Sequence, residues 1–425
     1  MKASHPLAMW IGRLLIAGIG LGILQGLQML LPHWLNPYYL DIINLAGINI
    51  ILAVSLNLIN GITGQFSLGH AGFMAVGAYS AACFTYYAGP RLILANGPVF
   101  AIALVIAAIA AGIAGLIVGL PSLRLRGDYL AIVTLGFGQI IVSLIRTINE
   151  IGGASGFSNL PQMSSFVWIY SGAILCILTV RNLADSNLGR SMRAVRDDEV
   201  AAEAMGINTT GIKVLAFVIS SMWAGVAGAL QVHYLQLAHP NDFTFVRSIE
   251  VVVMVVLGGL GSITGVTLSA VSLKILEEIL RTLSGAFWVG LGVVALSMAL
   301  SFSRYRSAMR ASVVGWLLWL RWPVLATLAI FLLFHYGQSW LQQNISALRY
   351  VIYSLILIVL MLLRPQGLLG RSELSWNLLR RRQIASAKES STGDPNTGDV
   401  SQGRAGSVAA HEPGEPADEG IEGTL

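Results

Sequence analysis

Charged side chains are scarce in this sequence of 425 residues. Asp, Glu, Lys and Arg together make up 11% of it, whereas they make up about 25% of a typical soluble domain. Hydrophobic residues reach 55%. They run unbroken for roughly 20 residues at a time, the length that crosses about 30 Å of hydrocarbon. The composition therefore argues against a soluble domain and predicts a polytopic membrane protein.

Alternation of apolar and polar residues is missing from the long apolar runs. Residues 101–109, AIALVIAAI, are apolar at every position, whereas a strand of a membrane barrel alternates. Because a spanning segment must satisfy its own backbone groups, helices remain. We predict an all-α membrane protein with about 10–12 transmembrane or half-membrane helices, at roughly 12–31, 39–60, 67–88, 98–119, 128–148, 164–181, 212–236, 247–260, 263–280, 286–302, 313–336 and 348–363.

Residues that carry chemistry are equally sparse. Cys83 and Cys176 lie singly in apolar runs and form no metal-ligand spacing or disulfide framework. The sequence contains no phosphate-binding loop with its lysine, no HExxH and no GxSxG motif. His70 and His233 stand alone in apolar runs, which favours hydrogen-bonded packing residues over ligands. We therefore predict no catalytic residue, no metal site and no cofactor.

Acidic residues deep in the predicted spans are also few. Asp41, Asp128 and Glu250 lie near predicted span ends, whereas proton- or sodium-driven carriers keep ionisable groups deep in the bundle. A transport protein of this composition, with neither an ion relay nor a nucleotide site, needs another subunit as its energy source.

Basic residues gather in alternate loops. Basic loops mark the cytoplasmic face of a membrane protein rather than a nucleic-acid site. Residues 14–31 are long for a signal peptide and end without a cleavage motif, so we predict an uncleaved first span and cytoplasmic N- and C-termini. With this orientation the following arginines all fall inside: Arg124, Arg126, Arg181, Arg190, Arg193, Arg196, Arg304, Arg306, Arg310, Arg364 and Arg371.

Two stretches within the apolar runs, 67–72 and 257–265, are dense in glycine. Glycine there permits either a broken helix or close packing of helices through small residues. Irregular backbone at membrane depth must be buried in protein or line a wet cavity. Under the first reading, the candidate residues of a translocation pathway are Ser67, Gly69, His70, Gly72, Gly258, Gly259 and Gly261. Under the second, the same residues only pack helices together.

A polar stretch, residues 193–211 (RAVRDDEVAAEAMGINTTG), interrupts the apolar sequence. Asp197 and Asp198 favour a helix start and Gly206 a helix end, which predicts a helix over 199–205. Such a short helix is marginal alone in water. Its apolar face is rich in alanine and has no Trp or Phe to anchor it in lipid. We therefore expect it to dock in a groove of a partner protein rather than lie on the membrane surface.

Residues 201–208, AAEAMGIN, resemble the cytoplasmic "EAA" loop of bacterial ABC importer permeases. Further stretches resemble the LivM-type permeases of the branched-chain amino acid importers, in the order that the family has them. They cover most of 40–282 and 348–370, and the matching segments are 60–73 (NGITGQFSLGHAGF), 123–138 (LRLRGDYLAIVTLGFG), 187–196 (NLGRSMRAVR), 256–265 (VLGGLGSITG) and 364–369 (RPQGLL).

The resemblance implies the architecture of an ABC importer permease in the bacterial cytoplasmic (inner) membrane. The implied partners are a second, LivH-like permease, two cytoplasmic ABC ATPases and an extracytoplasmic substrate-binding protein, within a lipid bilayer and without nucleic acid. In this reading Glu203 and Gly206 are coupling positions, and Ala202 and Ala204 permit close docking. Arg193 and Arg196 would pair with acids of the ATPase.

The implied division of the chain is a transmembrane domain over 1–370, with a cytoplasmic coupling loop at 182–211, and a cytoplasmic tail over 371–425. Residues 284–347 depart from the family pattern and look like an extra helical hairpin. The tail is rich in Ser, Gly, Pro, Asp and Glu, which predicts disorder.

The expected function is therefore that of a permease subunit for branched-chain amino acids, with ATP hydrolysis left to partner subunits. A related permease for urea or short amides and a self-sufficient channel or carrier remain the alternatives.

Overall fold

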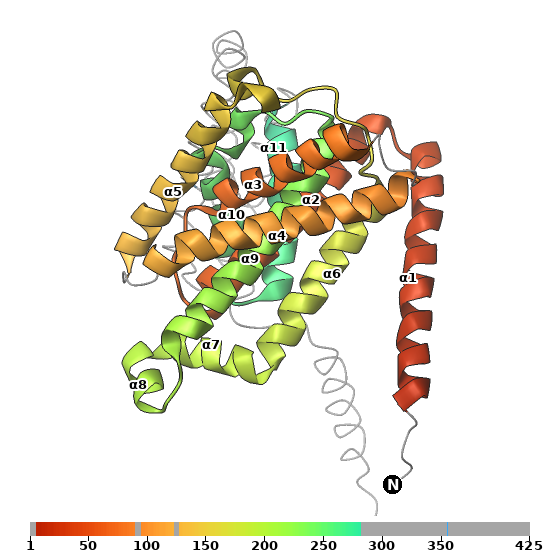
Figure 1. The fold of residues 1–425 in the computed structure, drawn as a ribbon. Coiled ribbons are helices and arrows are strands. Elements are labelled where there is room, and N and C mark those ends of the chain that lie inside the picture. The colour runs from red at the N-terminus through yellow and green to blue at the C-terminus, as the bar shows by residue number, and fades with distance from the viewer. Residues whose placement is uncertain (1–5, 90–94, 123–126, 282–354, 356–425) are drawn as a thin grey trace, which may run out of the picture. The chain divides into compact units, whose positions relative to one another are not determined.

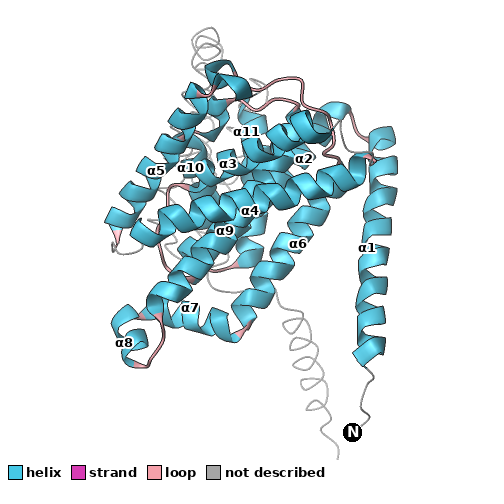
Figure 2. Ribbon diagram, in the orientation of Figure 1, coloured by secondary structure: helices cyan, strands magenta, loops and turns pink. Residues whose placement is uncertain are grey.

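The structure, a computed structural model, describes residues 6–89, 95–122, 127–281 and 355. These parts of the chain are helical (Figures 1 and 2), so the predicted all-α fold is confirmed. The helices are α1 (Pro6–Trp34), α2 (Pro37–Asn57), α3 (His70–Cys83), α4 (Asn96–Ser122), α5 (Asp128–Thr147), α6 (Phe166–Asp185), α7 (Asn187–Asp197), α8 (Glu199–Ala204), α9 (Thr209–Leu235), α10 (Phe245–Gly258) and α11 (Ile263–Arg281).

Short helical turns complete this part of the chain. Two are π-helical and continue α2 and α3, and three are 3-10 turns in the connections. They cover Leu58–Ile62, Phe84–Ala88, Asn149–Ile151, Gly153–Ser155 and Pro240–Phe243. The described backbone pairs in β fashion at one isolated bridge, between Phe157 and Ala238.

Five of the described helices are long and apolar enough to cross a membrane. They cover Pro37–Ile62, Asn96–Ser122, Tyr129–Thr147, Phe166–Asp185 and Thr209–Leu235. By contrast, α10 has 14 residues, or about 21 Å, which is too short for a full crossing. The predicted spans 286–302, 313–336 and 348–363, the hairpin 284–347 and the tail 371–425 lie outside the described residues, apart from residue 355.

The helices α3, α4 and α9 pack against one another through small residues. A Cβ atom added to Gly77 in α3 would lie 2.2 Å from the Cα atom of Gly225 in α9, so the two backbones touch. Close approach of this kind is how helices associate in membranes, where the hydrophobic effect does not drive them together. The aromatic rings of Phe73 and Phe217 meet edge to face beside this contact, with centroids 5.4 Å apart.

A second group of helices is formed by α2, α10 and α11. The α10–α11 pair is a hairpin, because Gly258 near its turn faces Gly265 and Val266 across it. At the far end of α11, the hydroxyl of Tyr38, at the start of α2, donates to Glu278. The hairpin therefore runs along α2, with its turn near the C-terminal end of α2.

One face of α4 is covered by no other described part of the chain. Val105, Ile109, Ile113 and Ile117 recur every four residues and are each more than half exposed. An apolar stripe of this size is costly in water. It is suited to lipid or to the surface of another membrane subunit.

Candidate functional site

The predicted short helix forms as α8, over Glu199–Ala204. Asp198 caps its start, because its Oδ1 atom accepts hydrogen bonds from the backbone N–H groups of Val200 (2.9 Å) and Ala201 (3.0 Å). At its end Gly206 has φ +83°, and the N–H group of Gly206 donates to Glu203. The start and the end predicted from the aspartates and the glycine are thus confirmed.

Most of the surface of α8 is uncovered by the rest of the described chain. Val200 is 65% exposed and Met205, just after the helix, is 82% exposed. Glu203 and Ala204 are exposed as well. Ala202 is the exception, at 4% exposure. Its small side chain therefore holds α8 to its own chain, whereas the sequence had suggested docking on a partner.

The connection from α8 into α9 is tied at two points. The Nζ atom of Lys213 lies 2.6 Å from Oε1 of Glu199, in an ion pair whose lysine is largely buried. Asn208 caps α9 by accepting from the N–H group of Gly211 at 2.9 Å. The ion pair therefore connects α8 directly to the start of α9.

On the other side α8 is joined to α7, whose buried residues Met192 and Val195 hold it against the bundle. Arg196, near the C-terminal end of α7, donates from Nη1 to the carbonyl oxygen of Gly61 at 3.1 Å and from Nη2 to Asp197 at 3.1 Å. Gly64, with φ +74°, lies against the stem of Arg196, because an added Cβ would be 2.4 Å from its Cγ. Arg196 thus contacts its own chain, and its role toward an ATPase stays a prediction.

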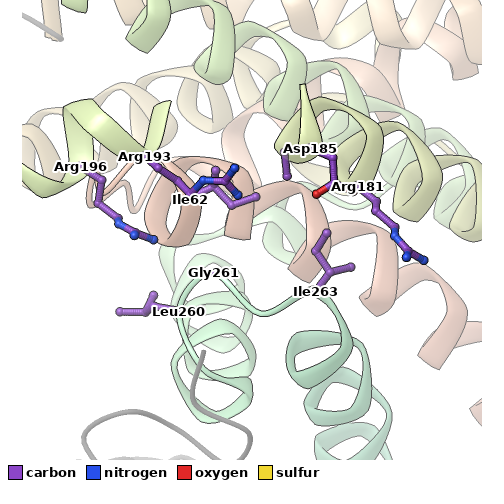
Figure 3. A pocket seen from close by; sticks show the side chains of 9 residues that line it. Ile62, Arg181, Asp185, Arg193, Arg196, Leu260, Gly261 and Ile263 are labelled. Carbon is purple, nitrogen blue, oxygen red and sulfur yellow. The ribbon is translucent and has the colours of Figure 1, made fainter. Parts of the chain in front are cut away.

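A cavity of about 280 Å³ lies where α6, α7 and the α10–α11 turn meet. Arg181, Arg193 and Arg196 line it together with a single acid, Asp185, so its lining has an excess of positive charge. Figure 3 shows these side chains above the turn that carries Leu260, Gly261 and Ile263. Arg193 and Arg196, which were expected to pair with acids of the ATPase, both line this cavity.

The turn between α10 and α11, in the glycine-rich stretch 257–265, meets the end of α2 at this site. The N–H group of Gly261 donates to Oδ1 of Asn57 at 2.9 Å. A Cβ atom on Gly61 would lie 2.3 Å from the backbone nitrogen of Gly261. The end of α2 and the tip of the α10–α11 hairpin therefore touch, and Arg196 bonds to the point of contact. Sequence reasoning singled out the stretch 257–265 but did not predict its contact with Gly61.

The backbone is not helical from Thr63 to Gly69, so the predicted span 67–88 is wrong in its first residues. The helix begins only at His70, whose Nε2 atom lies 2.9 Å from the Ser55 hydroxyl. The chain thus breaks between α2 and α3, and α3 starts inside the bundle.

Several glycines of the two glycine-rich stretches also pack tightly, as expected if these residues serve to pack helices together. An added Cβ would lie 2.4 Å from the Thr134 oxygen at Gly69, 2.7 Å from Gly138 at Gly72, and 2.5 Å from Val266 at Gly258. Gly259 and Gly261 have positive φ and form the hairpin turn. The pathway role stays a prediction for all seven residues.

Buried polar atoms without a hydrogen-bond partner follow the same break. Among the described residues they include Nδ2 of Asn57 and Asn60, both polar atoms of the Gln65 amide, the Ser67 hydroxyl and Nδ1 of His70. Buried polar groups normally have partners, and orphaned ones call for water or a ligand. Asn57, Asn60 and Gln65 were missed from the sequence. The sequence feature that could have revealed them is that these polar residues interrupt an apolar run.

His233, by contrast, is fully satisfied inside the chain. Its Nε2 atom lies 2.8 Å from the Thr85 hydroxyl and its Nδ1 atom 2.8 Å from the carbonyl oxygen of Ala229. It is a packing residue, as predicted. Within the described ranges, no group of three His, Cys, Asp or Glu residues could hold a metal ion.

The family profile described as "Branched-chain amino acid transport system / permease component" matches residues 38–303. The chain belongs to this family. It is thus a multi-pass membrane protein of a family of permease components, not of enzymes, as the sequence motifs predicted. The matched range includes residues 193–211 and both glycine-rich stretches.

Three relatives agree with this assignment. The chain is 35% identical over 285 residues to the high-affinity branched-chain amino acid transport system permease protein LivM of Salmonella typhimurium, covering 59% of this chain and 65% of the relative. It is 29% identical over 272 residues to a probable LivM of Methanocaldococcus jannaschii, covering 55% and 79%. It is 31% identical over 130 residues to LivH of Salmonella typhimurium, covering 30% and 42%.

The match thus spans less than two thirds of the length of the Salmonella relative LivM. No solved structure matches the chain.

Proposed function

We propose that the chain is the membrane-spanning permease subunit of an ATP-driven ABC importer that carries branched-chain amino acids across the bacterial cytoplasmic membrane. Membership of the permease family and the similarity to LivM support the substrate class. In this proposal the N- and C-termini are cytoplasmic, and α7 and α8 lie on the cytoplasmic face because the arginine-rich segments gather there.

The observation that carries the proposal is the exposed surface of α8. A capped, six-residue helix presents Val200, Glu203 and Met205 to solvent. An isolated helix of this length is marginal in water, and exposed apolar side chains beside a carboxylate suit a groove on another protein. We assign that groove to the cytoplasmic ATPases, with Glu203 and Gly206 as the coupling positions and Ala204 allowing close approach.

Movement of α8 would reach the membrane by two routes. The Glu199–Lys213 ion pair joins it to α9. Arg196 joins α7 to the contact between Gly61 and Gly261. ATP-driven closure of the ATPases would therefore shift the two broken helices relative to each other. The glycines and polar residues there, from Ser67 to Gly72 and from Gly258 to Gly261, are the proposed pathway.

The remaining proposed partners follow from membership of the permease family. A second permease of the LivH type would complete the pathway, and the similarity of this chain to LivH is what two homologous subunits would show. An extracytoplasmic binding protein would deliver the amino acid. The exposed stripe on α4 is available to lipid or to the second permease.

The test compares Glu203→Ala with the matched control Glu150→Ala, which removes an exposed carboxylate from the turn Asn149–Ile151. The complete importer is reconstituted in proteoliposomes, and ATP hydrolysis and leucine uptake are measured together. We expect Glu203→Ala to leave assembly at least partly intact and to lower substrate-stimulated ATP hydrolysis several-fold, with Glu150→Ala near wild type. Unchanged coupling in Glu203→Ala, or uptake by this chain reconstituted alone, would overturn the proposal.

A further inference from the structure

A second cavity, of about 330 Å³, lies among α2, α9, α10 and α11. It opens near the C-terminal end of α9, whereas α8 precedes the N-terminal end of the same helix. Because α9 has 27 residues, about 40 Å of helix separates the two ends. The volume is at the lower end of the roughly 300–1,000 Å³ of small-molecule sites. In the proposed orientation the cavity faces outward.

Charges of both signs line this cavity. Arg247 and Glu250 come from α10, and Lys274 and Glu277 come from α11. Lys274 lies within α11 between the apolar residues Leu273 and Ile275, and Glu277 lies three residues further along. Ionisable side chains inside a membrane protein are costly, and they mark substrate or ion pathways. The sequence analysis considered acids near the span ends and overlooked these two residues.

The charged groups are held in place by one another. Nη1 of Arg247 lies 3.1 Å from Oε2 of Glu250, and Nζ of Lys274 lies 3.0 Å from Oε2 of Glu277. Nη2 of Arg247 donates to Oδ1 of the buried Asn49 at 2.7 Å. The guanidinium is therefore fixed on two sides before any ligand arrives, which reduces the ordering cost of binding.

Two buried polar atoms at the cavity are nevertheless left without a partner among the described residues. They are Oε1 of Gln231, a residue that is only 7% exposed, and Nε of Arg247. One is a hydrogen-bond acceptor and the other a donor. Buried polar atoms of this kind are unfavourable unless water or a ligand meets them, so the site is built to hold something polar.

Apolar side chains complete the lining. Leu45 of α2, Leu235 of α9 and Val246 of α10 contribute aliphatic surface. Asp242, in the exposed turn before α10, adds one further acid. The cavity thus combines two cations, acids facing them, an open acceptor and an aliphatic wall.

We propose that this cavity binds a zwitterionic α-amino acid with an aliphatic side chain, an inference that rests on the proposed function above. Arg247 and Lys274 meet the carboxylate. Glu250, Glu277 and Oε1 of Gln231 meet the ammonium group. The aliphatic side chain lies against the apolar wall. Each of the two cations is already paired with an acid, so a zwitterion, which has no net charge, preserves this balance, whereas a ligand of one charge sign adds an unmatched charge.

The test measures equilibrium binding of radiolabelled leucine to the purified complex of both permeases and the ATPases, without the binding protein. Lys274→Gln removes one cation, and Gln231→Leu removes the open acceptor at similar volume. Gln139→Leu makes the same exchange in α5, which does not line the cavity. We expect the Kd to rise at least tenfold in Lys274→Gln and Gln231→Leu and to stay unchanged in Gln139→Leu.

Two competitors probe the charge requirement. Isoamylamine lacks the carboxylate and 4-methylpentanoate lacks the ammonium group, so neither should displace leucine from the wild-type complex at concentrations where leucine does. Equal displacement by either compound, an unchanged Kd in both cavity variants, or no saturable binding by the wild type would overturn the inference. Recovery of all subunits after purification shows that a variant complex assembles. If Lys274→Gln fails to assemble, the Kd of Gln231→Leu, which alters no charge, tests the inference by itself.

ATP-driven uptake with the binding protein present separates this inference from the proposed function. Wild-type complex that does not import leucine contradicts the proposed function itself. If the wild-type complex imports leucine but the cavity variants bind leucine normally, only the assignment of the cavity is contradicted, and the proposed function stands.

Discussion

Arg196 and Gly61 are 135 positions apart in the sequence and share a hydrogen bond of 3.1 Å, from the guanidinium Nη1 to the carbonyl oxygen. The bond joins the helix that precedes the exposed α8 to the end of α2, at the place where the chain breaks. Gly261, in the glycine-rich stretch 257–265, contacts Gly61 at the same place. The side chain of Arg196 therefore connects the polar stretch 193–211 to the contact between the end of α2 and the turn between α10 and α11.

Arg196→Lys should uncouple ATP hydrolysis from transport. Lysine keeps the charge but lacks the planar fork that bonds Gly61 and Asp197 at once. We expect the amount of leucine imported per ATP hydrolysed to fall several-fold in proteoliposomes, while the ATPases still copurify.

The matched control for this change is Arg190→Lys, on the same helix, where the arginine is exposed and donates to Asn187. If Arg190→Lys impaired coupling as much as Arg196→Lys, the effect would belong to α7 as a whole, and the transmission through Gly61 would be refuted.

Gly206→Ala should destabilise the end of α8 although the added methyl group contacts no neighbouring residue. The φ angle of Gly206 is +83° and an added Cβ would meet nothing within 4 Å, so the cost is conformational only, about 1–2 kcal/mol. We expect faster amide hydrogen exchange in 199–206 and weaker binding of the ATPases. Gly206→Asn should be milder, because asparagine adopts left-handed backbone more readily than alanine. Equal effects of the two substitutions would argue against this explanation.

Gly77→Ala should destabilise the bundle itself. Its new methyl group would lie 2.2 Å from the Cα atom of Gly225, so α3 and α9 must move apart. Overpacking of a tight contact costs typically 1–3 kcal/mol. We expect a lower melting temperature or yield of the detergent-purified complex. Gly136→Ala, in α5, has open space around the added atom and should behave like wild type; a melting temperature as low as that of Gly77→Ala would contradict the packing argument.

Local sequence rules predicted the local structure of the coupling segment. Asp198 and Gly206 bracket α8 because a capping carboxylate and a left-handed glycine act within a few residues of themselves. Hydropathy likewise located the five full-length spans, since lipid imposes their length. In both cases the cause lies within the segment, so the sequence of the segment is sufficient.

Contacts between distant segments were beyond these rules. Nothing near Gly61 in the sequence indicates that Gly261 lies beside it, and Arg196, predicted to meet a partner, bonds within its own chain. Lys274 and Glu277 were overlooked because their apolar neighbours dominate the hydropathy of 263–280. Ala202 was placed on the docking face, although the packing of α8 on its own chain buries it. Each of these outcomes depends on tertiary packing.

The helix α9 has 27 residues without a proline and is unbroken from the ion pair at Lys213 to Gln231 at the second cavity. A helix that connects two binding sites can couple them, and thermodynamic linkage makes any such coupling reciprocal. If docking of an ATPase on α8 changes the affinity of the cavity by some factor, occupancy of the cavity must change the affinity of α8 for the ATPase by the same factor. The amino acid would then act as an effector that reports its presence to the cytoplasmic motor before any of it has crossed the membrane.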